Sequence, residues 1–192
     1  MANNIKTIVD IAKSIIINER TGKAFEFETA SEVDVDPKVS QGKEEIKRIH
    51  NKILGIKRTE DIVYGYKLKL KDNVFNLDLM QLIDGGKLEN DEYVGIPAGE
   101  VVDKDEFTLV VFSEELEYKK VVGYVQFTWR HCLGKAPKWS IKDGKFVVPE
   151  FNAESIPDKG EKPVSVKAIK ELPKDLTTFS KEVLGKQVSS EH

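Results

Sequence analysis

Hydrophobic and polar residues alternate along much of the chain, and this period of two predicts β-strands. Residues 25–28 (FEFE) and 33–36 (VDVD) each place apolar side chains on one face and carboxylates on the other. The clearest strand covers residues 62–71, where tyrosines and leucines face one way and three lysines face the other. The pattern therefore predicts a mainly β protein with charged outer faces.

Further strands follow in the second half of the chain. Residues 107–112 and 121–129 flank a charged turn and predict a long hairpin. Asp143-Gly144 predicts a tight turn between strands at residues 139–141 and 146–151. Residues 164–169 predict the last strand.

One short helix is predicted between these two groups of strands. Apolar residues recur at helical spacing from Phe75 to Ile83. Asn76 is a suitable N-cap, and Gly85-Gly86 is a suitable C-terminal stop. Residues 87–105 predict a long polar loop.

Residues 43–58 are compatible with two structures. Ile46, Ile49, Ile53 and Ile56 recur at spacings of three and four, which suits an amphipathic helix. His50-Asn51 could equally form the tip of a long hairpin, and a glycine at position 55 weakens a helix. The pattern alone leaves both structures open.

Composition narrows the class of protein. With 192 residues and 40% hydrophobic residues, the chain can form one domain with a sizeable core. A net charge of −3 argues against tight nucleic-acid binding, which requires cations on phosphates. The single cysteine cannot form an intramolecular disulfide, and the longest aliphatic run, Ile15-Ile16-Ile17, is far too short for a membrane span. We therefore expect a soluble protein made in the cytoplasm.

Candidate catalytic and metal-binding residues are sparse. The three histidines are His50, His131 and the terminal His192, and Cys132 directly follows His131. Neighbouring side chains in a strand point to opposite faces, so this pair is badly placed for a Cys–His dyad. One cysteine cannot supply a closed zinc site, and Gly85-Gly86 lacks the Lys-Ser/Thr of a phosphate loop. The sequence predicts no enzyme, no metal and no cofactor.

A longer arrangement of motifs carries a resemblance over residues 40–173. Its parts, in order, are Thr59-Glu60-Asp61, Tyr64-Gly65-Tyr66, Asp72-Asn73-Val74-Phe75-Asn76, Asp84-Gly85-Gly86, Ile96-Pro97, the hairpin from Phe107 to Cys132, Asp143-Gly144-Lys145-Phe146-Val147-Val148-Pro149-Glu150-Phe151, Ile156-Pro157-Asp158-Lys159-Gly160-Glu161-Lys162-Pro163 and Leu172-Pro173. This order resembles the tail tube (major tail) proteins of long-tailed phages and prophages of Gram-positive bacteria.

The resemblance implies a β-sandwich or barrel-like tail-tube fold with one short flanking helix and a long protruding loop or hairpin. It implies hexameric rings that stack into a hollow tube through which DNA is ejected. The partners would be copies of the chain, other tail proteins such as the tape measure and terminator, and DNA that passes without specific binding. No membrane is involved. The expected location is the virion tail, after synthesis in the host cytoplasm.

Two sets of residues take roles within this resemblance. Strand alternation with an aqueous lumen predicts that Glu26, Glu28, Asp34 and Asp36 line the tube and repel phosphate. The resemblance favours the hairpin for residues 43–58, and it predicts a ring–ring contact through Ile46, Ile49, His50, Asn51 and Ile53.

The domain prediction is a single tail-tube domain over residues 1–175, with an N-terminal arm at 1–11 and a weakly structured extension at 176–192. One alternative function is the tube of a contractile tail or of a phage-derived bacteriocin, which adds an outer sheath. Another is a monomeric β-sandwich module that binds a sugar or peptide through aromatics in a cleft. Trp129 and Trp139 are the only tryptophans for such a cleft, and both are predicted to be core residues.

Overall fold

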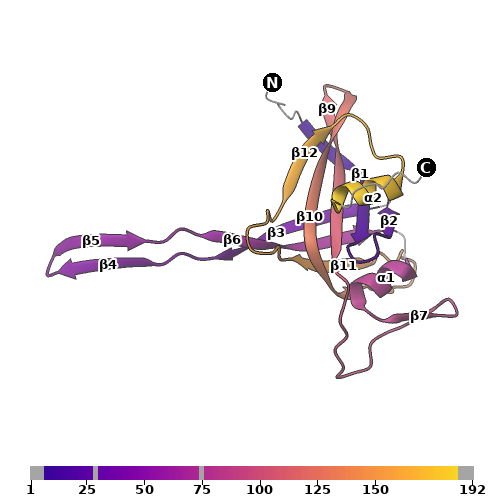
Figure 1. The fold of residues 1–192 in the computed structure, drawn as a ribbon, viewed down its shortest axis with the longest axis horizontal. Helices are drawn as coiled ribbons and strands as arrows, with labels where there is room; N and C mark the ends of the chain where they lie inside the picture. The colour runs from indigo at the N-terminus through magenta and orange to yellow at the C-terminus, as the bar shows by residue number, and fades with distance from the viewer. Residues whose placement is uncertain (1–6, 28–29, 74–75, 186–192) are drawn as a thin grey trace.

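The computed structural model describes residues 7–27, 30–73 and 76–185, and the protein is mainly β (Figure 1). One antiparallel sheet holds eight strands in the order β2-β1-β9-β10-β11-β6-β3, with β12 paired to β10. Its strands are β1 (Thr7–Asn18), β2 (Ala24–Phe27), β3 (Ala30–Ser40), β6 (Ile62–Asp72), β9 (Phe107–Glu117), β10 (Lys120–Lys138), β11 (Glu150–Ser155) and β12 (Ser165–Ile169).

Two separate hairpins and two helices complete the described chain. The hairpins are β4 (Glu44–Ile49) with β5 (Lys52–Arg58), and β7 (Lys87–Glu89) with β8 (Glu92–Val94). The helices are α1 (Leu77–Asp84) and α2 (Leu176–Val183). The β7–β8 hairpin occupies part of the segment that the sequence predicts to be a loop. Neither described helix is long and apolar enough to cross a membrane.

The main core lies on one face of the sheet, where both ends of the strand order contribute side chains. Leu68 and Leu70 of β6 and Phe151 of β11 meet Ile16 of β1 and Val111 of β9 in a single cluster. The alternation read from residues 62–71 is confirmed here, because the leucines are buried and the intervening lysines are not. The sheet therefore buries the same face at both of its ends.

A second, smaller core lies on the opposite face of β1 and β9. Ile15, Ile17 and Val110 pack there against Phe179 and Val183 of α2. The side chain of Asp175 caps α2 by accepting hydrogen bonds from the backbone amides of the first helical turn. The domain prediction places residues 176–192 in a C-terminal extension, and within it residues 176–183 form this helix, which covers an apolar face of the sheet. Residues 186–192 lie outside the described residues.

The N-terminal prediction also changes. Residues 7–11 of the predicted N-terminal arm belong to β1. They pair with β9, beginning with Thr7 opposite Leu116. Residues 1–6 lie outside the described residues. The boundary of the tail-tube domain at residue 175 stays a prediction.

Helix α1 forms as the sequence predicts. Asn76 accepts a hydrogen bond from the backbone amide of Leu79, and Gly85 ends the helix with a φ of 86°. Four residues bury the inner face of α1 in the main core; they are Leu79, Met80, Leu82 and Ile83. Gly134 of β10 lets the helix approach, since a Cβ there would lie 2.3 Å from the Ile83 carbonyl oxygen.

The predicted strands at residues 139–141 and 146–149 are absent. The β10–β11 ladder closes at the pair Lys138–Glu150, so the residues between them leave the sheet as a loop. The turn at Asp143-Gly144 is present within that loop. Trp129 is a core residue as predicted, whereas the side chain of Trp139 is 48% exposed, so its prediction as a core residue is wrong.

Substitution of Gly134 by alanine tests the seat of α1. We expect G134A to lower the free energy of unfolding by about 1–3 kcal/mol, because the added methyl group meets a backbone carbonyl that cannot rotate away. Gly55 has open space around its Cβ position, so G55A is the matched control. Urea unfolding of both variants would contradict this packing if G134A were as stable as the wild type.

Candidate assembly interface

A long two-stranded arm leaves the body of the protein (Figure 1). β3 and β6 pair along their length and lead directly into β4 and β5, which continue outward as a separate ladder. We call residues 43–59 the arm. The hairpin favoured by the resemblance for residues 43–58 is thus the structure observed, and the helix is not.

Hydrogen bonds at the base of the arm fix its direction. The backbone amide of Gly42 donates to Asp61 Oδ1 at 2.7 Å, and that of Lys43 donates to Thr59 Oγ1 at 2.7 Å. The backbone amide of Thr59 returns a bond to the Lys43 carbonyl at 3.0 Å. Thr59 and Asp61 belong to the Thr-Glu-Asp motif of the resemblance, so this motif positions the arm.

The register of the arm gathers its apolar side chains. Ile46 lies opposite Ile56, and Arg48 lies opposite Ile53 after a bulge. Residues directly opposite each other share a face, so the bulge brings Ile53 to the face of Ile46 and Ile56. Ile49 lies on the other face, next to the two-residue loop in which His50 has a φ of 50°.

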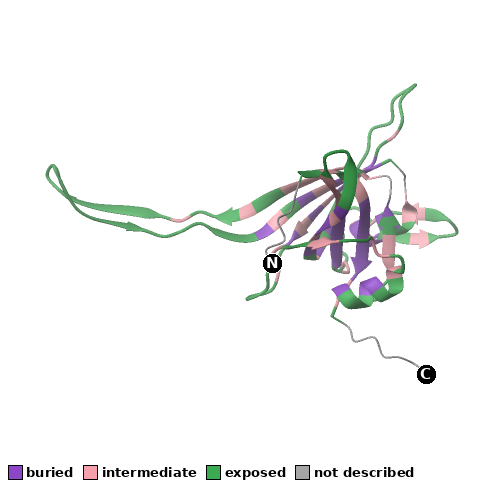
Figure 2. Cartoon of the chain, turned by 90° about the horizontal axis from the view of Figure 1, so that it is seen from above, coloured by how far each residue is buried: buried purple, intermediate pink, exposed green. Residues whose placement is uncertain are grey.

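No side chain of the arm strands is buried. Every residue of β4 and β5 is exposed, including Ile46 at 47% and Ile56 at 59% (Figure 2). A two-stranded hairpin without a packed face is marginally stable in water. A contiguous exposed apolar surface of this kind marks an interaction site. The five predicted ring–ring residues all lie on the arm or its turn, although their contact with another ring stays a prediction.

A ladder of alternating charges covers the outer face of β3, β6 and β11. Asp34 lies opposite Lys69 and Asp36 opposite Lys67, and Lys67 in turn lies opposite Glu154. Lys71 contacts Glu32 at 2.6 Å, and Lys69 contacts both Glu32 and Asp34. We call this surface the charge ladder. Its residues are Glu32, Asp34, Asp36, Lys67, Lys69, Lys71, Glu150 and Glu154.

The ladder perturbs two carboxyl groups. Hydrogen bonds from Lys71 and then Lys69 lower the pKa of Glu32 to about 2. Hydrogen bonds from Lys135 and then Lys38 lower the pKa of Glu154 to about 2. The face that the alternation suggested would be strongly acidic is therefore largely neutralised, because lysines from neighbouring strands, including Lys38 and Lys135, lie among the carboxylates.

The three predicted lumen residues that the structure describes lie on strands at opposite ends of the strand order. Asp34 and Asp36 lie together in the charge ladder. Glu26 lies on β2, at the other end of the strand order, and forms an ion pair with Lys13. Glu28 lies outside the described residues. Their position in a lumen stays a proposal.

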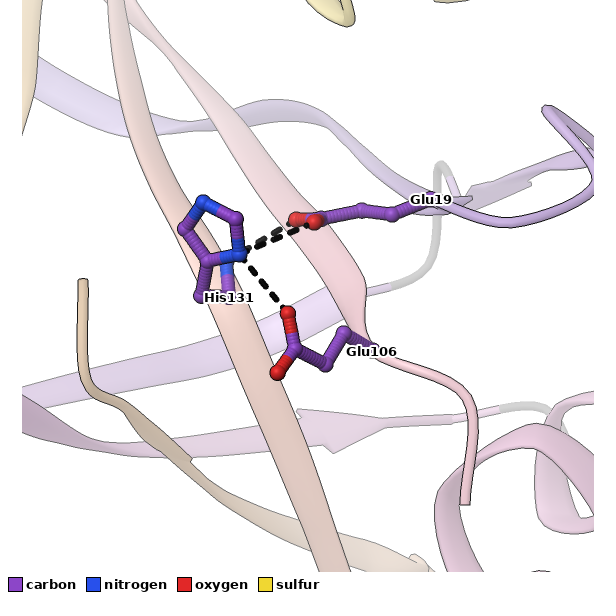
Figure 3. A group of neighbouring side chains, drawn as sticks. All are labelled: Glu19, Glu106 and His131. Atoms are coloured by element: carbon purple, nitrogen blue, oxygen red, sulfur yellow. Dashed lines mark hydrogen bonds and ion pairs between the residues drawn. The ribbon is translucent and has the colours of Figure 1, made fainter. Parts of the chain in front are cut away.

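His131 lies at the centre of a cluster that sequence spacing did not predict (Figure 3). Its Nδ1 lies 2.7 Å from Glu106 and 3.2 Å from Glu19, and its Nε2 lies 2.9 Å from Glu161. Glu19 also accepts hydrogen bonds from the His131 backbone amide at 2.9 Å and from Thr108 at 2.7 Å. These residues come from four separated segments, so no local motif could have revealed them.

Three carboxylates surround the His131 imidazole and favour its protonated form. Burial lowers the pKa of His131, but the hydrogen bond to Glu106 and the charges of Glu19, Glu106 and Glu161 outweigh it, so that the pKa is raised. The ligand atoms of Glu19, Glu106 and His131 are within 4.8 Å of one another, as are those of His131, Asp158 and Glu161. That spacing would also admit a cation, but the pairing of both ring nitrogens with carboxylates already accounts for the geometry.

Cys132, the residue after His131, belongs to the main core. Its side chain is fully buried in the main core, and burial raises the pKa of its thiol to about 12. A thiol with that pKa supplies almost no thiolate at neutral pH. The chain is irregular here, because the β9–β10 register shifts between Trp129 and Cys132 and His131 has a φ of 51°.

Comparison with known proteins gives no sequence relative and several structural likenesses. The sequence matches no protein-family model and no curated protein. Similar solved chains include one from the sheath–tube complex of the PVC extracellular contractile injection system in its extended state, at 9% identity and a TM-score of 0.48, covering 84% of this chain and 92% of the other.

Two further similar chains come from the anti-feeding prophage. One belongs to the tube-terminating cap, at 10% identity and a TM-score of 0.43, covering 87% of this chain and 99% of the other. The second belongs to the baseplate, at 14% identity and a TM-score of 0.41, covering 82% of this chain and 91% of the other.

The His131 cluster predicts a pH-dependent stability. Because the folded-state pKa of His131 lies above the ordinary value of about 6.5, its ion pairs contribute fully below pH 6.5 and are lost as the pH rises through the raised pKa. We expect the melting temperature of the wild type, measured relative to that of H131Q, to fall as the pH is raised from 6 to 9. A constant difference between the two melting curves over that range would contradict the network.

Proposed function

We propose that this protein is the structural subunit of a phage-like tail tube, which assembles with copies of itself into rings that stack around an open lumen. In such a particle the protein would act through contacts between copies and would contain no active site. Its further partners would be other tail proteins, such as the tape measure and terminator.

The observation that carries this proposal is the arm. A hairpin whose side chains are all exposed, and which is held rigidly at its base, is suited to contact another molecule beyond the body of its own chain. A subunit that reaches outward in this way makes a different surface contact at each end. Repetition of such a head-to-tail contact produces closed rings or continuous stacks.

The resemblance over residues 40–173 supports the same function. Its motifs correspond to structural devices: the Thr-Glu-Asp run holds the base of the arm, and Gly85-Gly86 ends α1. The outer edges of β2 and β3 end the main strand order of the sheet. Pairing of such edges between neighbours would extend the sheet around a ring and remove exposed edges.

The charge ladder is suited to the wall of a DNA conduit. Its lysines lie opposite carboxylates, so a passing phosphate would find few uncompensated cations to bind. Asp34 and Asp36 belong to this surface, and we propose that they line the lumen together with Glu26 and Glu28. Hexameric closure of the ring belongs to the same proposal.

The tube of a contractile tail or phage-derived bacteriocin is a second form of the same function. It would use the same arm and ring contacts, and it differs by the sheath that binds its outer wall. Co-purification with a sheath protein would distinguish the two forms.

A monomeric ligand-binding module is the candidate from another class. It takes some support from the exposed Trp139, which lies in a surface hollow with Ile141. Such a module leaves the fully exposed arm without a role. The tube subunit accounts for both features and is the preferred function.

Negative-stain electron microscopy of the concentrated protein tests the tube directly. We expect rings or hollow tubes of uniform width from the wild type. The variant I46S/I56S should remain folded, because both side chains are exposed, and should fail to stack. The matched variant I46V/I56V keeps the apolar surface and should assemble.

Two outcomes would contradict the proposal. Wild-type protein that stays monomeric at every concentration is not a self-assembling tube subunit. Tubes from I46S/I56S as abundant as those of the wild type would leave tube formation intact but exclude the arm as its contact.

A further inference from the structure

An acidic lobe lies on the side of the body away from the arm. We define it as residues 87–103, which comprise β7, β8 and the loop that follows. The segment contains five acidic residues and one lysine. The acidic residues are all exposed; they are Glu89, Asp91, Glu92, Glu100 and Asp103. Figure 1 shows β7 at the opposite end of the molecule from β4 and β5.

The acidic lobe is held firmly on the body. The hydroxyl group of Tyr93 donates a hydrogen bond to Asp84 at the end of α1. Gly86 makes room for this contact, because a Cβ there would lie 2.5 Å from the Tyr93 hydroxyl oxygen. Burial, with the Asp84 contact, raises the pKa of Tyr93 above its ordinary range. The lobe thus presents its carboxylates in a defined place.

Two of these carboxylates oppose each other directly. Glu89 on β7 pairs with Glu92 on β8, and both side chains are exposed. Like charges directly opposite on an antiparallel pair are destabilising. A hairpin of three-residue strands has little packing to offset that repulsion, so the arrangement favours a cationic partner that would relieve it.

An apolar hollow adjoins the acidic lobe. It is lined by Leu77 of α1, Tyr93, Trp139 and Ile141, and Asp91 and Glu92 lie at its margin. Trp139 is 48% exposed and Ile141 is 77% exposed. This surface therefore combines aromatic and aliphatic side chains with neighbouring carboxylates, and an apolar centre with a polar rim is typical of protein interfaces.

The tip of the arm has the complementary composition. Residues 46–56, which we call the arm tip, carry three basic residues and no acidic residue; the basic residues are Lys47, Arg48 and Lys52. Four isoleucines and Leu54 lie among them, all exposed. The arm tip is thus apolar and basic where the lobe and hollow are apolar and acidic.

We propose that the arm tip of one copy docks on the acidic lobe and hollow of a second copy. The two surfaces lie at opposite ends of one chain, so they can meet only between molecules (Figure 1). The contact is head-to-tail, and it specifies the partner surface of the arm. It rests on the proposed function only in requiring that the protein associates with itself.

Other charged surfaces fit the arm less well. The charge ladder already pairs its carboxylates with lysines of the same sheet. The C-terminal end of β9 carries Glu114, Glu115 and Glu117, but Glu115 and Glu117 have interactions within their own chain. The acidic lobe joins exposed carboxylates to an apolar hollow, and both properties of the arm tip are matched there.

Charge reversal on each side tests the contact. We expect K47E/R48E and E89K/E92K each to raise the critical concentration for assembly by about tenfold or more, and the combination of all four changes to restore it. The control K119E/K120E alters the net charge by the same amount as K47E/R48E but at the turn between β9 and β10. It should assemble as the wild type does. Melting temperatures of all variants check that the fold is retained.

A neutral variant separates docking from stability. E89Q/E92Q removes the repulsion between the two glutamates, so its melting temperature should equal or exceed that of the wild type. Its assembly should nevertheless weaken, and the difference from the wild type should shrink in high salt because salt screens exposed charges. Unchanged assembly by E89Q/E92Q and E89K/E92K, in tubes that still form, would overturn the docking but leave the tube function standing.

A disulfide test gives an answer even without tubes. L54C and I141C chains, mixed under oxidising conditions, should form a crosslinked pair, and native Cys132 is too buried to compete. A crosslink without hollow tubes would support the docking and contradict the tube function. Absence of the crosslink, together with unchanged self-association of E89K/E92K, would overturn the docking in either case.

Discussion

The antiparallel pairing of β3 with β6 is the constraint on which the rest of the structure depends. Its register places Val33 opposite Leu70 and Val35 opposite Leu68, so these residues face the core together. The same register places the intervening carboxylates of β3 opposite the lysines of β6 on the outside. A shift by one residue would exchange the two faces and bury the charges. One pairing thus defines both the core and the charge ladder.

That pairing also determines where the arm goes. β3 and β6 run beyond the core, and their continuation as β4 and β5 inherits the direction of the ladder. Within the body, the apolar side chains on the inner face of β3 and β6 pack across the sheet and against α1. In the arm no opposing layer covers the strand pair, so its isoleucines stay in water. The apolar surface of the arm is therefore a consequence of extending a strand pair past its core.

Local patterns predicted those parts of the fold that depend on neighbouring residues. The faces of β6 follow from alternation, and both ends of α1 follow from Asn76 and Gly85. Patterns failed where distant residues decide. Residues 139–141 have strand-like composition, but the β10–β11 ladder closes at Lys138 and Glu150 and leaves them outside the sheet. Trp139 is exposed for this reason, although its residue type favours burial.

The candidate site shows the same division. The isoleucines of the arm were visible in the sequence, but the pattern did not decide between two structures. Their spacing of three and four suits a helix, whereas His50-Asn51 suits the tip of a hairpin. The bulge that joins Ile53 to Ile46 and Ile56 was not visible. Neither was the His131 cluster, since Glu19, Glu106 and Glu161 reach it from separate segments of the chain.

The distribution of charge gives the arm its specificity. Apolar surface alone would let arms associate with one another, side by side, through the same isoleucines. The cations of the arm tip oppose that arrangement because two tips carry the same sign, whereas the acidic lobe carries the other. The repulsion between Glu89 and Glu92 is a modest local cost, and it keeps the lobe selective for a basic partner. Attraction between unlike ends and repulsion between like ends together favour head-to-tail growth over random aggregation.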